Sequence, residues 1–262
     1  MMRMQSLLSG SSGNCYYLES GGEAILIDAG VGLRTLKKVL ADNGLDYGSF
    51  SAILLTHDHM DHIRNLASYC KRLNKPVFAT PYLFTHSWAM QSEYIQACRR
   101  YLEEGAWNQV GPFRVRYFEV PHDATQTVGY AIAAEDHRFV LMTDIGRMTP
   151  EALSWARQAD TVVIESNYDM EMLLGGSYPQ ELKDRISHGI GHLSNEACAT
   201  AITAVMHPGL KNIFLCHLSG NNNTPQLAYD SAARALEELG VERGSVALRV
   251  LYRGVCSPLL TL

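Results

Sequence analysis

Three histidines and two aspartates stand within six positions, in the run His57-Asp58-His59-Met60-Asp61-His62. Imidazole nitrogens and carboxylate oxygens are the ligands that divalent metals such as zinc and manganese take in proteins. Two such ions held side by side can activate water and polarise a phosphoryl or carbonyl oxygen. The run therefore predicts a metal site, and hydrolysis as the chemistry of that site.

The apolar segment 52–55 precedes this run and is typical of a buried strand, and loops after such strands form the sites of α/β proteins. His57 and His59 are two residues apart, so in an extended loop their side chains point the same way and can bind one ion. Asp61 and His62 stand where the chain turns into a predicted helix, and they can reach a second ion. The alternative is a polar loop with surface histidines.

Further ligand-type residues follow other apolar, strand-like runs, and they argue against that alternative. His122 follows segment 113–120, and Asp144 and His217 each follow a comparable run. Taken singly, each can be structural, so the prediction rests on the set. The predicted ligands are His57, His59 and His122 for one metal, and Asp61, His62 and His217 for the other. Asp144 can bridge the two metals, since a carboxylate has two oxygens.

These residues resemble the metallo-β-lactamase-fold hydrolases along essentially the whole chain. The resemblance also includes Gly10-Ser11-Ser12-Gly13-Asn14 and Leu26-Ile27-Asp28-Ala29-Gly30. It implies the α/β fold class, as a four-layer αββα sandwich with a dinuclear site at one edge of the two sheets. It also implies that Asp28 orients a ligand without binding metal itself. The whole chain, 1–262, is expected to form a single domain of this fold.

The composition is that of an ordinary globular protein, with 47% hydrophobic and 19% charged residues. No run approaches eighteen uninterrupted apolar residues, and the N-terminal apolar stretch is too short for a signal peptide. Six scattered cysteines without a C-x-x-C pair predict free thiols in a reducing cytoplasm. Cys216 beside His217 could be a ligand, but neighbours on a strand point to opposite faces. We therefore expect a cytoplasmic protein with no membrane contact.

The hydrophobic pattern alternates between strands and helices, and prolines at 81, 150 and 225 mark helix starts. The predicted strands are 6–9, 15–20, 24–28, 52–56, 76–79, 161–165, 212–216 and 248–255, with a strand-rich block at 107–143. The predicted helices are 33–43, 62–73, 81–102, 150–158, 195–206 and one that ends near 239.

Two further residues bear on the reaction. Glu165 ends the predicted strand 161–165, and His192 precedes a helix for which Ser194 or Asn195 suits the N-cap. A histidine that binds no metal but is held by a carboxylate can protonate a leaving group. The alternatives are a helix-capping or core histidine and a plain salt-bridge glutamate. The predicted catalytic residues are Asp61, Glu165 and His192.

The segments Glu165-Ser166-Asn167, Gly191 to Asn195 and His217-Leu218-Ser219 resemble the nucleic-acid-processing branch of this fold, ribonuclease Z and the β-CASP nucleases. The chain has neither the inserted β-CASP domain nor a long ribonuclease Z arm. With Asn221-Asn222-Asn223, the segments resemble the YycJ (WalJ) family in order and spacing. That resemblance implies a 5′→3′ DNA exonuclease linked to DNA repair and supported by manganese. The predicted substrate-binding residues are Ser11, Ser12, Asn14, Asn167, Ser219 and Asn222.

The net charge of −5 and pI near 6.0 are unusual for a nucleic-acid binder. Any DNA groove must therefore be local. The preference for DNA over RNA as the partner is what the family resemblance implies. Aromatic residues and arginines in segment 88–107 can stack on bases, although a packed helical cover fits them better. The candidate basic pairs are Lys71 and Arg72, Arg99 and Arg100, Arg114 and Arg116, and Lys183 and Arg185.

The favoured function is a phosphodiesterase with two divalent ions, zinc or manganese. The predicted ligands are five histidines and two aspartates, and this mixture excludes neither metal. The main alternative is a thioester or small-ester hydrolase of the glyoxalase II type, which would not need Glu165 and His192. A second alternative is a binding protein on a vestigial hydrolase fold, but such proteins usually lose ligands. A β-lactamase role is least favoured, and the sequence leaves the oligomeric state open.

Overall fold

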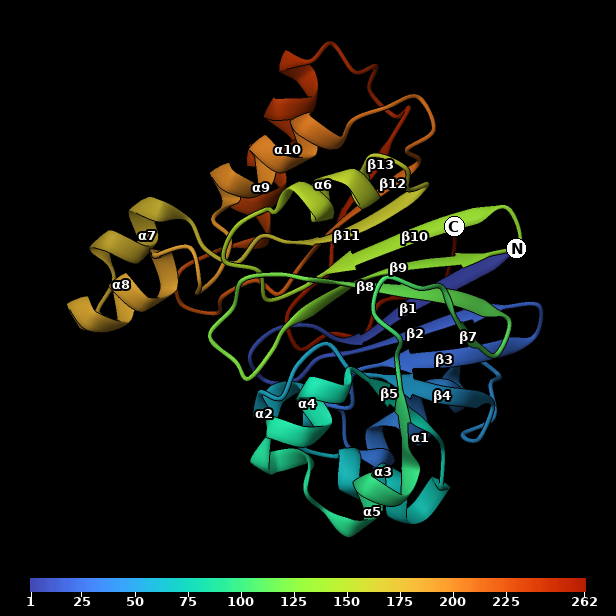
Figure 1. The fold of residues 1–262 in the computed structure, drawn as a ribbon. Coiled ribbons are helices and arrows are strands. Elements are labelled where there is room, and N and C mark those ends of the chain that lie inside the picture. The colour runs from blue at the N-terminus through green and yellow to red at the C-terminus, as the bar shows by residue number, and fades with distance from the viewer.

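Two seven-stranded sheets face one another in the computed structural model, which describes residues 1–262. Helices cover the outer face of each sheet (Figure 1). In order across the first sheet, the strands are β14 (Leu260–Thr261), β1 (Met2–Leu8), β2 (Cys15–Ser20), β3 (Glu23–Ile27), β4 (Phe50–Leu54), β5 (Val77–Ala79) and β6 (Arg99–Tyr101). Across the second they are β13 (Ala247–Val250), β12 (Asn212–Cys216), β11 (Thr161–Glu165), β10 (His137–Met142), β9 (Val128–Ala134), β8 (Phe113–Glu119) and β7 (Asn108–Val110).

Each sheet has an antiparallel part and a parallel part. Strands β1 to β3 pair antiparallel, and β3 to β6 pair parallel. In the second sheet β7 to β10 are antiparallel and β10 to β13 parallel. Parallel neighbours need crossover connections, and here helices supply most of them. The helices are α1 (Leu33–Asp42), α2 (Met60–Ile63), α3 (Leu66–Leu73), α4 (Pro81–His86), α5 (Glu93–Cys98), α6 (Pro150–Ala156), α7 (Met170–Gly175), α8 (Gln180–Ser187), α9 (Asn195–Val205) and α10 (Pro225–Glu238).

Three clusters of buried apolar residues separate the four layers. The cluster between the sheets includes Tyr16 and Phe214, the second packs α1 and α3 to α5 on the first sheet, and the third packs α6, α9 and α10 on the second. Residues of β2 alternate between the first two clusters, because successive strand residues point to opposite faces. The four-layer αββα sandwich predicted from the sequence is confirmed.

The carboxyl ends of β4, β10, β11 and β12 lie at one edge of the sandwich, on the side of α2, α7 and α8 (Figure 1). Loops after parallel strands meet at such an edge, and this is where the predicted ligands lie. None of the helices has both the length and the apolar character that crossing a bilayer would require.

The predicted helix 81–102 is wrong. The chain forms α4, a 3₁₀ turn at Trp88–Met90, α5 and then strand β6 on the edge of the first sheet. Ser87 and Ser92 have non-helical backbone angles between these pieces, and serine favours such positions. The periodic side chains that suggested one helix still pack on the sheet, but from several short elements.

Other boundaries also differ from the predicted ones. The predicted helix 62–73 is split at Asn65 into α2 and α3, and strand β1 begins at Met2 because it pairs along β2 and β14. Strand β13 ends at Val250, five residues before the predicted end. Helices α7 and α8 fill segment 170–187, for which no element was predicted.

Candidate metal centre

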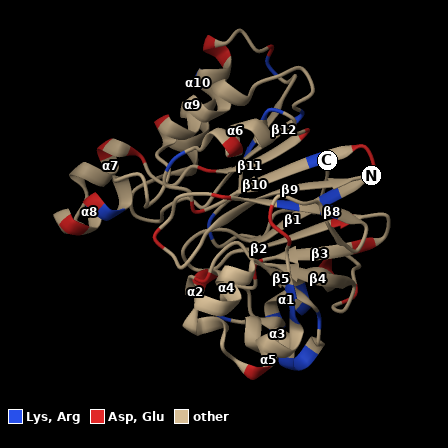
Figure 2. Ribbon diagram, viewed as in Figure 1, with Lys and Arg blue, Asp and Glu red and all other residues tan.

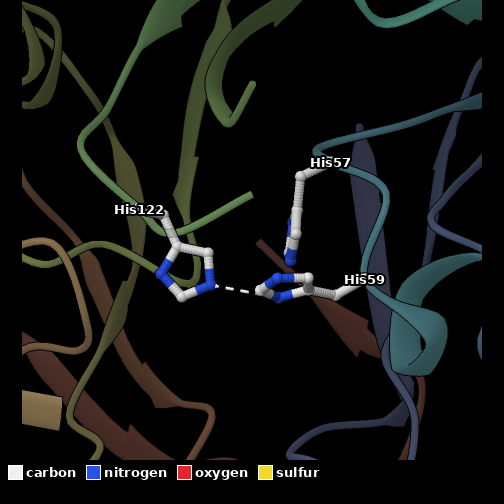
Figure 3. A group of neighbouring side chains, drawn as sticks. All are labelled: His57, His59 and His122. Atoms are coloured by element: carbon white, nitrogen blue, oxygen red, sulfur yellow. Dashed lines mark hydrogen bonds between the residues drawn. The ribbon is translucent and has the colours of Figure 1, made fainter. Parts of the chain in front are cut away.

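One group of three histidines comes from two loops. His57 and His59 follow β4, and His122 follows β8. Their rings point toward one another (Figure 3), and one ring nitrogen from each lies within 4.8 Å of the others. Nδ1 of His59 and Nε2 of His122 are 3.3 Å apart. The structure therefore brings together the first ligand set that the sequence predicted.

The other nitrogen of each ring is held by a neighbouring group. Nδ1 of His122 donates to the carbonyl oxygen of Gly191 at 2.7 Å, and Nε2 of His59 contacts the carbonyl oxygen of Asp123 at 3.2 Å. Nδ1 of His57 is 3.0 Å from the Thr56 hydroxyl. Such contacts fix a ring's orientation and leave its free nitrogen for a metal.

The second predicted set also comes together. A ring nitrogen of His62, a ring nitrogen of His217 and a carboxylate oxygen of Asp61 lie within 4.8 Å of one another. Asp61 Oδ2 is 3.6 Å from Nε2 of each histidine. Asp28 holds the opposite nitrogen of His62 at 2.7 Å, and Glu165 holds that of His217 at 2.8 Å.

Asp144 lies between the two groups. Its Oδ1 is 3.7 Å from Nε2 of His122, and its Oδ2 is 3.1 Å from Nε2 of His62. The two oxygens of this fully buried carboxylate therefore face ligands of both sets. This is the position that a bridging carboxylate needs.

Left-handed backbone conformations turn three of these side chains toward the site. Asp28 directly follows β3, Asp144 lies two residues after β10, and His217 directly follows β12. Their φ angles are 64°, 53° and 55°. This region is uncommon outside glycine, although aspartate and histidine enter it more often than most residues. Such strained positions gather at functional sites.

The residues fit divalent metal ions. Nε2 of His57 and Nε2 of His217 are buried and have no hydrogen-bonding partner in the protein. A buried polar atom without a partner is costly, and a cation bound in each of the two ligand groups would satisfy these nitrogens. His and Asp are also the donor types that this class of metal takes.

The electrostatic field favours a cation as well. Burial alone would lower the pKa of His62, but the charges of Asp28 and Asp144 raise it to about 10. Burial would likewise lower the pKa of His217, yet Asp144 and the neighbouring carboxylates raise it well above its usual value. The same carboxylates attract metal ions, and protons compete with a metal for these nitrogens.

Asp28 is placed to orient His62. The carboxylate is fully buried, accepts hydrogen bonds from the Thr56 backbone N–H and hydroxyl at 2.9 Å each, and lies in no group of candidate ligands. We expect Asp28→Asn to weaken metal binding about 10- to 100-fold, because the neutral amide holds His62 less well. Titration with a competing chelator measures this affinity, and an unchanged value would contradict the positioning role.

Glu165 contacts two histidines at once. Its Oε1 lies 2.8 Å from Nδ1 of both His192 and His217, and its Oε2 accepts from the backbone N–H of Ile145 and Leu193. The predicted Glu165–His192 pair is therefore present in the structure. The sequence did not indicate that the same carboxylate also holds the ligand-type residue His217.

A pocket of about 250 Å³ opens over these side chains, and His192 lies in its wall. Segment 178–186 forms one side of the pocket with Tyr178, Leu182, Arg185 and Ile186. Arg185 pairs with Asp123, which joins α8 to the loop that carries His122. This wall was missed because segment 170–187 shows no ligand spacing, although Lys183 and Arg185 were noted as a basic pair.

Comparison with known proteins agrees with this geometry. A family model described as a beta-lactamase superfamily domain matches residues 23–217. The chain is 35% identical to exodeoxyribonuclease WalJ of Streptococcus pneumoniae over 243 residues, which cover 90% of this chain and 89% of that protein. It is 32% identical to exodeoxyribonuclease YycJ of Bacillus anthracis over 234 residues, 89% of each protein. The chain belongs to the beta-lactamase superfamily, and within it to the WalJ/YycJ family.

Solved structures of other proteins share the fold. The metallo-beta-lactamase fold protein YhfI from Bacillus subtilis superposes with a TM-score of 0.73 at 15% identity, over 98% of each chain. The short form of human tRNase Z gives a TM-score of 0.64 at 14% identity, over 99% of this chain and all of that one. At such identities the likeness shows the fold alone.

The predicted substrate-binding residues of this WalJ/YycJ-family chain are only partly at the pocket. Ser11, Asn167 and Ser219 line it, whereas Ser12 is exposed outside the lining. Asn14 is fully buried beneath the ligands, where its amide lies 3.1 Å from Asp61 Oδ2 and 2.8 Å from His62 Nε2.

Asn222 is also buried outside the lining, and its side chain lies against the backbone at Gly176. A substrate contact by Asn14 or by Asn222 therefore does not fit the structure of this family member. Asn14 instead contacts two of the candidate ligands, Asp61 and His62. Cys216 packs in the core between the sheets and belongs to no ligand group, as the alternation of strand residues predicted.

Most of the noted basic pairs lie outside the pocket lining. Lysines and arginines gather around α3 and α5 (Figure 2), where Lys71 lies over the ring of Tyr94 at 4.9 Å. Arg114 and Arg116 lie over the rings of Trp107 and Trp155. Of the eight basic residues noted from the sequence, only Arg185 lines the pocket.

Proposed function

We propose that this protein is a metal-dependent 5′→3′ exodeoxyribonuclease that acts in DNA repair. The observation that carries the proposal is the Glu165–His192 pair beside the ligand groups, with Nδ1 of His192 on Glu165 at 2.8 Å. A thioester or small-ester hydrolase would not need this pair. The names of the WalJ and YycJ relatives support the exonuclease and favour DNA over RNA.

We propose two divalent ions, zinc or manganese, with Asp144 between them. The first would be held by His57, His59 and His122, and the second by Asp61, His62 and His217. When bound, such ions activate water and neutralise charge on the phosphoryl group. The two ligand groups and the two orphaned imidazole nitrogens support this assignment.

His192 acts as the general acid in this proposal. Its Nδ1 is occupied by Glu165, its Nε2 has no hydrogen-bonding partner in the protein, and the side chain is 23% exposed in the pocket wall. Burial alone would lower the pKa of His192, but the charge and hydrogen bond of Glu165 raise it above the usual value. The imidazolium therefore persists near neutral pH and can protonate the leaving 3′-oxygen through Nε2.

We further propose that residues 1–262 form one domain, because strands of both sheets share the central cluster of buried side chains. A cytoplasmic location is proposed from the cysteines. All six are free thiols and five of them are buried, as in proteins of a reducing compartment.

The test is a nuclease assay with end-labelled double-stranded DNA, single-stranded DNA and RNA, in manganese or zinc. We expect mononucleotides to be released from 5′-phosphorylated DNA ends. Wild-type protein without added metal, after treatment with a chelator, serves as the control. If metal-loaded protein cleaves none of the three polymers, the nuclease proposal is wrong, and a small-ester hydrolase becomes the hypothesis to test with thioester substrates.

A further inference from the structure

We propose that Arg253 binds a phosphate group of the DNA strand at the rim of the metal pocket. The inference rests on the proposed nuclease function and adds a residue to it that no motif indicates. Arg253 stands three residues after β13, and it reaches the pocket only through the fold. Its Nη2 lies 3.4 Å from the hydroxyl of Ser11, which lines the pocket.

Two glycines make room for this side chain. A Cβ atom at Gly220 would lie 2.0 Å from Nη1 of Arg253, and one at Gly10 would lie 3.1 Å from its Cγ. The guanidinium therefore lies directly on the backbone beside Ser219, and its stem lies on the backbone beside Ser11. Both serines line the pocket, so the loops hold the charge at a fixed place on the rim.

The charge of Arg253 is available to a ligand. The side chain is exposed and forms no ion pair with any carboxylate of the chain. Arg185, the cation within the pocket lining, is already paired with Asp123. In a protein of net charge −5, an unpaired guanidinium beside three pocket carboxylates is the local positive group that a DNA strand requires.

Neighbouring donors suit a phosphate as well. The backbone N–H groups of Ser11 and Gly220 donate to no protein atom, and both belong to the loops under Arg253. A planar guanidinium can bind two phosphate oxygens, while backbone N–H groups and hydroxyls commonly complete such contacts. The phosphate can be the 5′-terminal group or a backbone group next to the scissile bond, since the two have the same chemistry.

The test compares Arg253→Ala with Arg243→Ala, which removes the same charge. Arg243 is exposed and unpaired. It precedes β13, whereas Arg253 follows that strand, so the control residue lies at the opposite end of β13 from the pocket rim. We expect Arg253→Ala to lower kcat/KM on 5′-phosphorylated single-stranded DNA about tenfold or more. For this variant, the slope of log(kcat/KM) against log salt concentration should become shallower by about 0.7, which is the value for one phosphate contact on a single strand. Arg253→Lys should keep the slope and lose part of the rate.

Hydrolysis of bis(p-nitrophenyl) phosphate separates this inference from the proposed function. That small diester has no neighbouring phosphate, so Arg253→Ala should hydrolyse it at the wild-type rate. A rate on DNA equal to that of Arg243→Ala, or an equal loss on both substrates, would overturn the phosphate contact. If the wild type hydrolyses the small diester but no DNA, the proposed nuclease function itself is wrong, and the inference is overturned with it.

A second substrate identifies which phosphate is bound. If Arg253→Ala is impaired on 5′-phosphorylated ends and matches the wild type on 5′-hydroxyl ends, Arg253 binds the terminal phosphate. An equal loss of activity on both kinds of end would show that Arg253 binds a backbone phosphate. Either result supports the contact.

Discussion

The Asp61→Ala variant is expected to lose its nuclease activity together with bound metal. Asp61 Oδ2 lies 3.6 Å from Nε2 of both His62 and His217, so the substitution removes one donor from the second ligand group. Loss of a residue that only supports a ligand already costs 10- to 100-fold in affinity, and loss of a direct donor should cost more. Metal analysis of the purified protein and the DNA assay measure the two effects.

Asp58→Asn is the matched control for this experiment. Asp58 lies in the same loop and also carries a carboxylate, but it accepts hydrogen bonds from Thr125 and belongs to no ligand group. The control should keep its metal and its activity. If Asp61→Ala retained a full complement of metal and the wild-type rate, its place among the ligands would be refuted.

The His192→Ala variant is expected to keep its metal and to cleave DNA about a hundredfold more slowly, or slower still. His192 has no place in either predicted metal set, and its proposed role is to donate a proton from Nε2 while Glu165 holds Nδ1. The kcat on DNA and the metal content of the same preparation measure the two halves of this prediction.

A change of leaving group gives this prediction its control. p-Nitrophenolate leaves without protonation, so His192→Ala should hydrolyse bis(p-nitrophenyl) phosphate at close to the wild-type rate. Equal losses on DNA and on this diester would show that His192 positions the site and does not act as a general acid. Wild-type activity of His192→Ala on DNA would remove it from the mechanism altogether.

The clustering of the candidate ligands was predictable from the sequence, because each of them follows a local pattern. The run from His57 to His62 follows an apolar strand, and His122, Asp144 and His217 follow others. Strand ends in a parallel sheet meet at one edge, so a pattern read along the chain also indicated proximity in space.

Segments without such a pattern were predicted less well. The region 81–102 has the apolar spacing of a helix, yet the structure divides it among short helices and an edge strand. Its apolar side chains would pack on the same sheet from one long helix or from several short elements. Periodicity therefore could not distinguish these two arrangements. Helices α7 and α8 went unpredicted because the sequence of α8 is strongly polar and none of its side chains is buried, so it has no apolar stripe that would mark a helix packed on the core.

By itself, the sequence determined which residue types could hold metal and which strands present them, since these depend on neighbours along the chain. Only the tertiary structure decided what surrounds them. It buried Asn14 beneath the ligands, gave Glu165 two histidine partners, and laid Arg253 across loops more than 30 and 240 residues away in sequence. Such contacts depend on how distant segments pack together, and no local pattern in the chain records that packing.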